Sequence, residues 1–105
     1  MVEEKKEKIV NMLRLAKKAK AVALGRVAVE KDILKHRTKL IFSGKRSYPQ
    51  AGGRKRAEIC KQQGIQISYI FSDEDLSKIF NRQKLTLVAI SNINFAKGIK
   101  NILNN

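Results

Sequence analysis

A continuous apolar segment near the C-terminus, LTLVAIS (85–91), constrains the fold of this chain more than any other feature. A strand without polar alternation is covered on both faces of its sheet, so this segment predicts a central strand. Three shorter apolar segments are also expected to form strands: 21–24 (AVAL), 38–43 (TKLIFS) and 65–71 (IQISYIF). In the last of these, alternation predicts that one face of the strand carries Ile65, Ile67, Tyr69 and Phe71.

Helical patterns alternate with these strands along the chain. In residues 4–19, the spacing i, i+3, i+4 and i+7 that marks one helix face is occupied by Ile9, Met12, Leu13 and Ala16. Further helices are expected at 26–36, at about 54–63, directly after Ser72, and at 92–103. Gly64 is suited to end the third helix, and Ser72 is suited to cap the fourth, whose first turn is acidic.

The resulting order, in which helices and short strands alternate from one end to the other, predicts an α/β fold. Helices that flank a single sheet on both faces form a three-layer α/β/α sandwich. A length of 105 residues suits a single domain spanning 1–105. The segment 44–54, which contains the only proline, is expected to be a loop.

Positive charge is the main functional signal in the composition. The chain has 23 Lys and Arg against 9 Asp and Glu, a formal net charge of +14. Most of the excess falls in residues 1–61, in three clusters: Arg14, Lys17, Lys18 and Lys20; Lys35, Arg37 and Lys39; and Lys45, Arg46, Arg54, Lys55 and Arg56. Such an excess predicts a polyanionic partner, with nucleic acid ahead of an anionic membrane surface.

Three features bear on the compartment. No window of 18 apolar residues occurs, so no membrane span is expected. The first residues, MVEEKKEKIVNML, lack the apolar core of a secretory signal. The only cysteine, Cys60, has no partner for an internal disulfide, which favours a reducing compartment. We therefore expect a cytoplasmic protein.

Residues with catalytic or metal-binding chemistry are sparse. His36 lies between Lys35 and Arg37, whose positive charge opposes a metal cation. Cys60 has no second cysteine or plausible histidine base, so it is expected to be a packed thiol. The acids 73–75 fit a helix start without a metal, and no phosphate-binding glycine motif occurs. The sequence therefore predicts no enzyme activity, no cofactor and no metal.

Three segments in order carry a resemblance to a known family: NMLRLAKKAKAVALG (11–25), VAVEKDILKHRTKLIFSG (27–44) and LVAISNINFAKGI (87–99). Together they resemble the ribosomal protein L-seven-Ae family, which is related to L-thirty-e, and specifically its small bacterial members. The resemblance covers nearly the full length. It implies a four-stranded mixed sheet in an α/β/α sandwich and binding to RNA, typically at kink-turns or related internal loops.

The resemblance also implies where RNA would bind. In the family, the turn into the second helix has the form G-x-N-E-x-x-K, whose glycine and lysine correspond to Gly25 and Lys31. The Asn and Glu that read base edges correspond to Val27 and Ala28, so direct readout of bases is lost at these positions. Phosphate positioning by the turn can remain, and Arg26 is a substitute donor.

A second binding segment is assigned by the same resemblance to the loop after the last strand. It corresponds to Ser91, Asn92, Ile93 and Asn94, with Ile93 as an apolar contact and Asn94 in a left-handed conformation. We expect this loop to form the other wall of the Gly25 site. After the second strand, Arg46 adds positive charge beside that site.

The leading hypothesis is thus a non-enzymatic protein, associated with the ribosome in translation, that binds structured RNA, which we expect to be ribosomal RNA. The predicted RNA-binding residues are Gly25, Arg26, Val27, Ala28, Lys31, Lys35, Arg46, Ser91, Asn92, Ile93 and Asn94. The alternative is a protein-interaction module that docks on a transcription or translation factor, with Val27 and Ala28 in an apolar contact patch.

Overall fold

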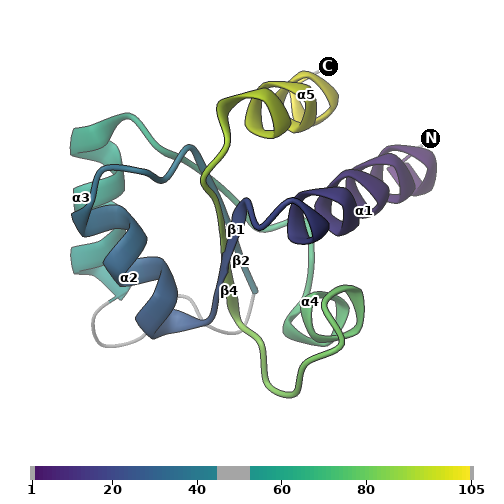
Figure 1. The fold of residues 1–105 in the computed structure, drawn as a ribbon, viewed down its shortest axis with the longest axis horizontal. Coiled ribbons are helices and arrows are strands. Elements are labelled where there is room, and N and C mark those ends of the chain that lie inside the picture. The colour runs from purple at the N-terminus through teal and green to yellow at the C-terminus, as the bar shows by residue number, and fades with distance from the viewer. Residues whose placement is uncertain (1, 45–52, 105) are drawn as a thin grey trace.

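Four short strands form one mixed sheet in the computed structural model, which describes residues 2–44 and 53–104. Helices and strands alternate as the sequence predicts (Figure 1). The elements are α1 (Val2–Lys18), β1 (Val22–Leu24), α2 (Arg26–Leu34), β2 (Leu40–Ser43), α3 (Gly53–Gln63), β3 (Gln66–Ser68), α4 (Asp73–Ile79), β4 (Leu87–Ile90) and α5 (Ile93–Leu103). Most ends differ by one to three residues from the predicted ones, which is the usual uncertainty of element boundaries.

The strand order in the sheet is β1-β4-β2-β3. β4 pairs antiparallel with both β1 and β2, whereas β2 and β3 are parallel. All four residues of β4 are buried, which confirms the prediction of a central strand made from the apolar segment 85–91. The predicted four-stranded mixed sheet is likewise confirmed.

Helices cover both faces of this sheet and complete the predicted sandwich. α1, α4 and α5 lie on one face, and α2 and α3 lie on the other (Figure 1). Side chains alternate along β4: Val88 and Ile90 pack beneath α1, α4 and α5, whereas Leu87 and Ala89 pack beneath α2 and α3. Both faces of the strand are therefore apolar, since each one belongs to a different core.

The predicted strand at 65–71 is only partly correct. β3 ends at Ser68, and Phe71 packs with the core beneath α1, α4 and α5 instead of sharing a face with Ile65. The reason is topological. The chain leaves the sheet after β3 and must pass from the α3 side to the α4 side, so its side chains change cores.

Two predicted helix signals have the expected geometry. The Ser72 hydroxyl accepts a hydrogen bond from the Asp75 N–H at 3.1 Å, while the Asp75 carboxylate accepts one from the Ser72 N–H at 3.2 Å. This is a reciprocal capping box at the start of α4. Gly64 follows α3 with φ +71°, the left-handed conformation that ends many helices.

Part of one predicted feature lies outside the described residues. The loop predicted at 44–54 falls mostly in residues 45–52, and with it Lys45 and Arg46. Its first residue is described: the Gly44 N–H donates to the Thr86 carbonyl oxygen at 2.9 Å, which ties the end of β2 to the segment before β4.

The helices α1 and α3 end with the same closing motif, at Lys20 and at Gly64. At both, the N–H of the left-handed residue bonds three residues back and the next N–H bonds five residues back. Lys20 (φ 57°) carries a side chain in this conformation, so Lys20→Gly is expected to raise the free energy of unfolding by about 1 kcal/mol in urea denaturation.

The reciprocal change is the control. A Cβ at Gly64 would have no atom within 4 Å, so Gly64→Ala isolates the cost of the backbone conformation and is expected to lower stability by about 1 kcal/mol. Changes of the same sign in both variants would contradict this explanation.

Candidate nucleic-acid interface

The turn from β1 into α2 has a backbone that requires glycine. Gly25 has φ +90° and ψ 164°, a region that residues with a side chain essentially do not adopt. Its N–H donates to the Leu87 carbonyl oxygen at 2.8 Å, and its own carbonyl accepts from the Val29 N–H at 2.9 Å. A Cβ at Gly25 would have no atom within 4 Å, so conformation and not space makes glycine necessary here.

The start of α2 differs from the starts of α4 and α5. Ser72 caps α4 and the Asn92 side chain caps α5, but no side chain caps α2, and its first turn contains no acid. Among the described residues, the N–H groups of Arg26, Val27 and Ala28 have no hydrogen-bond acceptor. These donors, at the positive end of the helix dipole, are suited to bind an anion.

The outer face of α2 is mixed in character, while its inner face holds the helix in place. Val29 and Ile33 are buried in the core beneath α2 and α3, as their spacing predicts. On the opposite face, Val27 is 67% exposed, and Lys31 is exposed one turn further along. Arg26 is exposed and Ala28 is half-buried.

Lys35 lies at the other end of this helix. It is the C-cap of α2, so the nine residues of the helix, at about 1.5 Å each, separate it from Gly25 by roughly 14 Å. It is exposed. Lys35 therefore does not belong to the same compact site as Gly25.

The structure also separates Ser91–Asn94 from Gly25, contrary to the prediction. Because β1 and β4 are antiparallel, Gly25 lies beside Leu87 at the start of β4, whereas the Ser91 N–H bonds to the Ala21 carbonyl at the other end of β1. Figure 1 shows the starts of α2 and α5 at opposite ends of the sheet. The 91–94 segment thus cannot form the other wall of the Gly25 site.

The 91–94 segment forms the start of a helix. α5 begins at Ile93, directly after its cap, and Asn92 Oδ1 accepts from the Asn94 and Phe95 N–H groups at 2.8 and 3.3 Å. Asn94 is helical, so the predicted left-handed conformation is wrong. Ile93 is 52% exposed, as an apolar contact residue would be.

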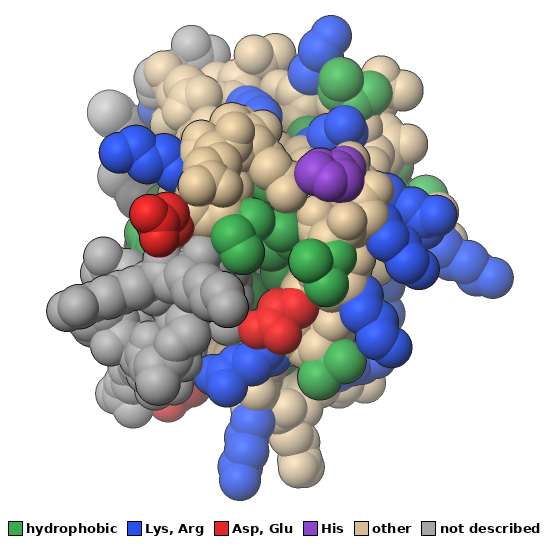
Figure 2. All heavy atoms as spheres, turned by 90° about the vertical axis from the view of Figure 1, so that its left-hand side faces the viewer, with side chains coloured by type: hydrophobic (Ala, Val, Ile, Leu, Met, Phe, Trp, Pro, Cys, Tyr) green, Lys and Arg blue, Asp and Glu red, His purple; other side chains and the backbone are tan. Residues whose placement is uncertain are grey.

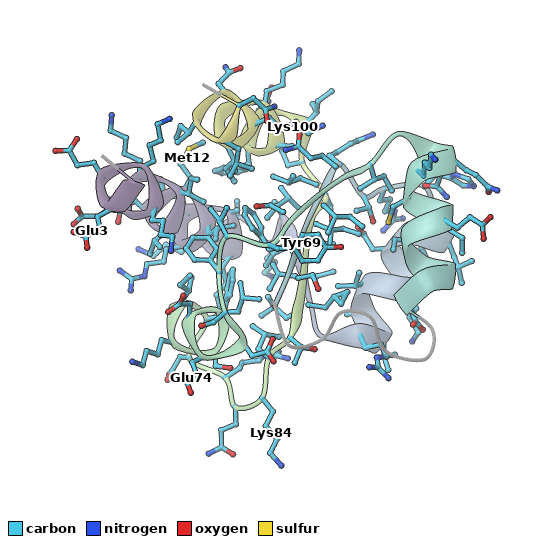
Figure 3. All side chains as sticks on the ribbon, turned by 180° about the vertical axis from the view of Figure 1, so that it is seen from behind. Glu3, Met12, Tyr69, Glu74, Lys84 and Lys100 are labelled. Carbon is cyan, nitrogen blue, oxygen red and sulfur yellow. The ribbon has the colours of Figure 1, made fainter. Side chains whose placement is uncertain are left out.

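The segment that shares the Gly25 end of the sheet is the one before β4. Lys84, in a left-handed turn (φ 53°), is exposed and projects from the tip of this segment (Figure 3). Arg82 is also exposed. An open cavity of about 590 Å³ lies alongside, between this segment and α4, and its lining includes Arg82, Lys84 and Thr86. No sequence pattern points to these residues, since only the antiparallel pairing of β1 with β4 brings them to this end of the sheet.

Asp32 was also missed, and it connects three parts of the fold. Its two carboxylate oxygens accept hydrogen bonds from Thr38 Oγ1 at 2.6 Å and from Ser91 Oγ at 3.0 Å. The bonds join α2 to the segment before β2 and to the end of β4. Ser91, predicted to bind RNA, therefore has a structural contact in the protein.

Arg46 lies outside the described residues. Cys60 is buried in the core beneath α2 and α3, as expected for a packed thiol.

Within residues 2–44 and 53–104, no three His, Cys, Asp or Glu side chains gather where they could hold a metal ion. In the same residues, no helix is both long enough and apolar enough to span a membrane.

Comparisons with solved structures identify proteins that share this fold. A protein of unknown function from Bacillus halodurans has a TM-score of 0.79 at 15% identity, over 93% of this chain and 98% of that one. A 15.5 kD RNA-binding protein from Giardia lamblia has a TM-score of 0.77 at 14% identity, over 96% and 86%. The Pelota protein from Thermoplasma acidophilum has a TM-score of 0.61 at 18% identity, over 85% of this chain and 28% of that one.

These TM-scores establish a common fold. No protein family model matches the chain, and no curated protein matches it. The chain is thus an α/β/α sandwich, as the sequence predicts, and it shares this fold with the RNA-binding protein from Giardia lamblia.

Proposed function

We propose that this protein binds structured RNA, without catalysis, through the Gly25 surface, defined as residues 25–28, Lys31, Arg82 and Lys84. The observation that carries the proposal is the uncapped start of α2. Three N–H groups at the positive end of a helix, with arginine and lysine side chains at the same end of the sheet, match the chemistry of a phosphate group. The shared fold with an RNA-binding protein supports the same assignment.

Phosphate contacts fix how such a protein sits on RNA, and base contacts determine which RNA it selects. Val27 and Ala28 have no hydrogen-bonding side chain, so this surface has lost two groups that read base edges in the family that the sequence resembles. We therefore propose recognition by RNA shape, such as the bend of a kink-turn or related internal loop. We propose that the RNA with this shape is ribosomal RNA.

Binding to a kink-turn RNA and to an unkinked control of equal length tests this function. In an electrophoretic mobility shift at fixed salt, we expect tighter binding to the kinked RNA, because only it presents phosphates in the required arrangement. Equal affinity for both would contradict shape recognition and leave general RNA binding. No binding to either at low salt would contradict the proposed function altogether.

A docking role for α2 is the second candidate, and one observation favours it. Val27 and Leu34 are 67% and 73% exposed, and their spacing of seven residues places them along one face of the helix. Figure 2 shows hydrophobic side chains on this side of the molecule, among the basic ones. A transcription or translation factor could cover such a patch.

A further inference from the structure

A basic cavity lies at the end of the molecule away from Gly25. It has a volume of about 280 Å³, and the side chains that line it include His36, Thr38, Lys39, Gln63 and Lys100. They come from the end of α2, the segment before β2, the end of α3, and α5. Figure 2 shows the histidine with Lys and Arg side chains nearby, and Figure 3 places Lys100 on the side of α5 towards α3.

The backbone that shapes this cavity is fixed by two helix ends. His36 and Gly64 are both left-handed, and each closes its helix with the same pair of backbone hydrogen bonds. Carbonyl groups at a helix end would repel an anion. Here the Ile33 carbonyl oxygen accepts hydrogen bonds from the His36 N–H at 3.0 Å and from Gln63 Nε2 at 3.4 Å. Both bonds satisfy this carbonyl and so reduce its repulsion of an anion.

The two lysines of the cavity are half-buried, and no carboxylate in the described part of the chain pairs with them. Within the described residues, neither Lys39 Nζ nor Lys100 Nζ forms a hydrogen bond or an ion pair, and no described Asp or Glu lines the cavity. The carboxylate next to Thr38 is Asp32, whose two oxygens already accept from Thr38 and Ser91. Both side chains line the same partly enclosed cavity, so an anion bound there would lie near two positive charges.

We propose that this cavity is a binding site for a phosphate group, held between Lys39 and Lys100 with the Gln63 amide at its edge. Lysine is suited to phosphate as a point charge, and the cavity has room for one or two phosphate groups. The phosphate could belong to an RNA backbone or to a free phosphorylated molecule. The site does not rest on the proposed RNA function, since a free ligand would fill it equally.

Titration of the full-length protein with inorganic pyrophosphate, at constant ionic strength in sodium chloride, tests the site. In amide NMR spectra we expect a saturable shift of Gly64, whose signal falls in the sparse glycine region. The double variant Lys39→Gln/Lys100→Gln is expected to weaken the binding seen at Gly64 at least tenfold, a change of about 1.4 kcal/mol. The variant Lys8→Gln/Lys97→Gln, which removes the same charge from exposed positions, is expected to bind as the wild type does.

Two results would overturn the site. One is the absence of a saturable Gly64 shift in the wild type. The other is equal weakening in both double variants, which would mean that net charge alone attracts pyrophosphate. Circular dichroism of the variants checks that each is folded, and both pairs of substitutions are chosen from side chains that leave the apolar cores intact.

A short oligouridylate then separates the two sources of phosphate. If RNA backbone is the ligand, Lys39→Gln/Lys100→Gln also weakens RNA binding and lowers the salt slope by about 1.4, which is about 0.7 for each lost contact with a single strand. If a free phosphorylated molecule is the ligand, pyrophosphate binding falls while RNA affinity stays equal to that of Lys8→Gln/Lys97→Gln.

Discussion

Replacing Asp32 by alanine is expected to lower the free energy of unfolding by about 2–3 kcal/mol, since hydrogen bonds to a charged group contribute about 1.5 kcal/mol or more each. The variant removes the shared acceptor of Thr38 and Ser91. Thr38 is buried, so its hydroxyl would be left without this partner. Urea denaturation followed by circular dichroism measures the change.

A double-mutant cycle with Thr38→Val distinguishes the contact from a general loss of charge. Once the hydroxyl is gone, Asp32→Ala no longer leaves it unsatisfied, so the double variant should be about 1 kcal/mol more stable than the sum of the two losses predicts. Glu7→Ala, which removes an exposed carboxylate from α1, is the control and should change stability by less than about 0.5 kcal/mol. Strict additivity would contradict the contact.

Reversing the charge of the Gly25 surface is expected to weaken RNA binding strongly. The variant Arg26→Glu/Lys31→Glu/Lys84→Glu should weaken RNA binding about 100-fold or more at low salt, because three cations that contact phosphates become anions that repel them. Each lost phosphate contact also lowers the salt dependence of binding. All three side chains are exposed, so the fold should be retained. Fluorescence anisotropy with the kink-turn RNA, over a series of salt concentrations, measures both effects.

The matched control carries the same net charge change elsewhere: Lys8→Glu/Lys61→Glu/Lys97→Glu, all at exposed positions. It should weaken binding only by the general loss of attraction, about threefold to tenfold. Equal losses in the two triple variants would contradict a localised RNA surface. If α2 docks on a protein instead, Val27→Ser/Leu34→Ser abolishes partner binding and the charge reversals leave it intact.

The architecture could be predicted because it depends on local patterns that agree with one another. The apolar run in β4 requires cover on both faces, and the amphipathic spacing of Ile9 and Leu13 in α1 provides part of that cover. Ser72 and Gly64 mark helix ends through their own backbone chemistry. None of these inferences needs knowledge of which strands are neighbours.

The site could not be predicted in full because it depends on strand direction. Gly25 was found from its own turn, but its neighbour across the sheet is set by a pairing between Leu24 and Val88, which are far apart in sequence. Without that pairing, the segment after β4 and the segment before it are equally plausible partners. Asp32 was missed for the same reason, since Ser91 lies 59 residues away.

Among the residues whose burial the structure describes, the core beneath α2 and α3, over which the candidate binding helix lies, has fewer buried side chains than the other. Among the described residues, twelve buried apolar side chains form the core beneath α1, α4 and α5, and seven form the core beneath α2 and α3. Fewer buried contacts mean that a layer opens more readily on its own. Backbone amides of α2 should thus exchange with solvent earlier than those of α1, and a ligand on α2 would slow that exchange by stabilising the weaker layer.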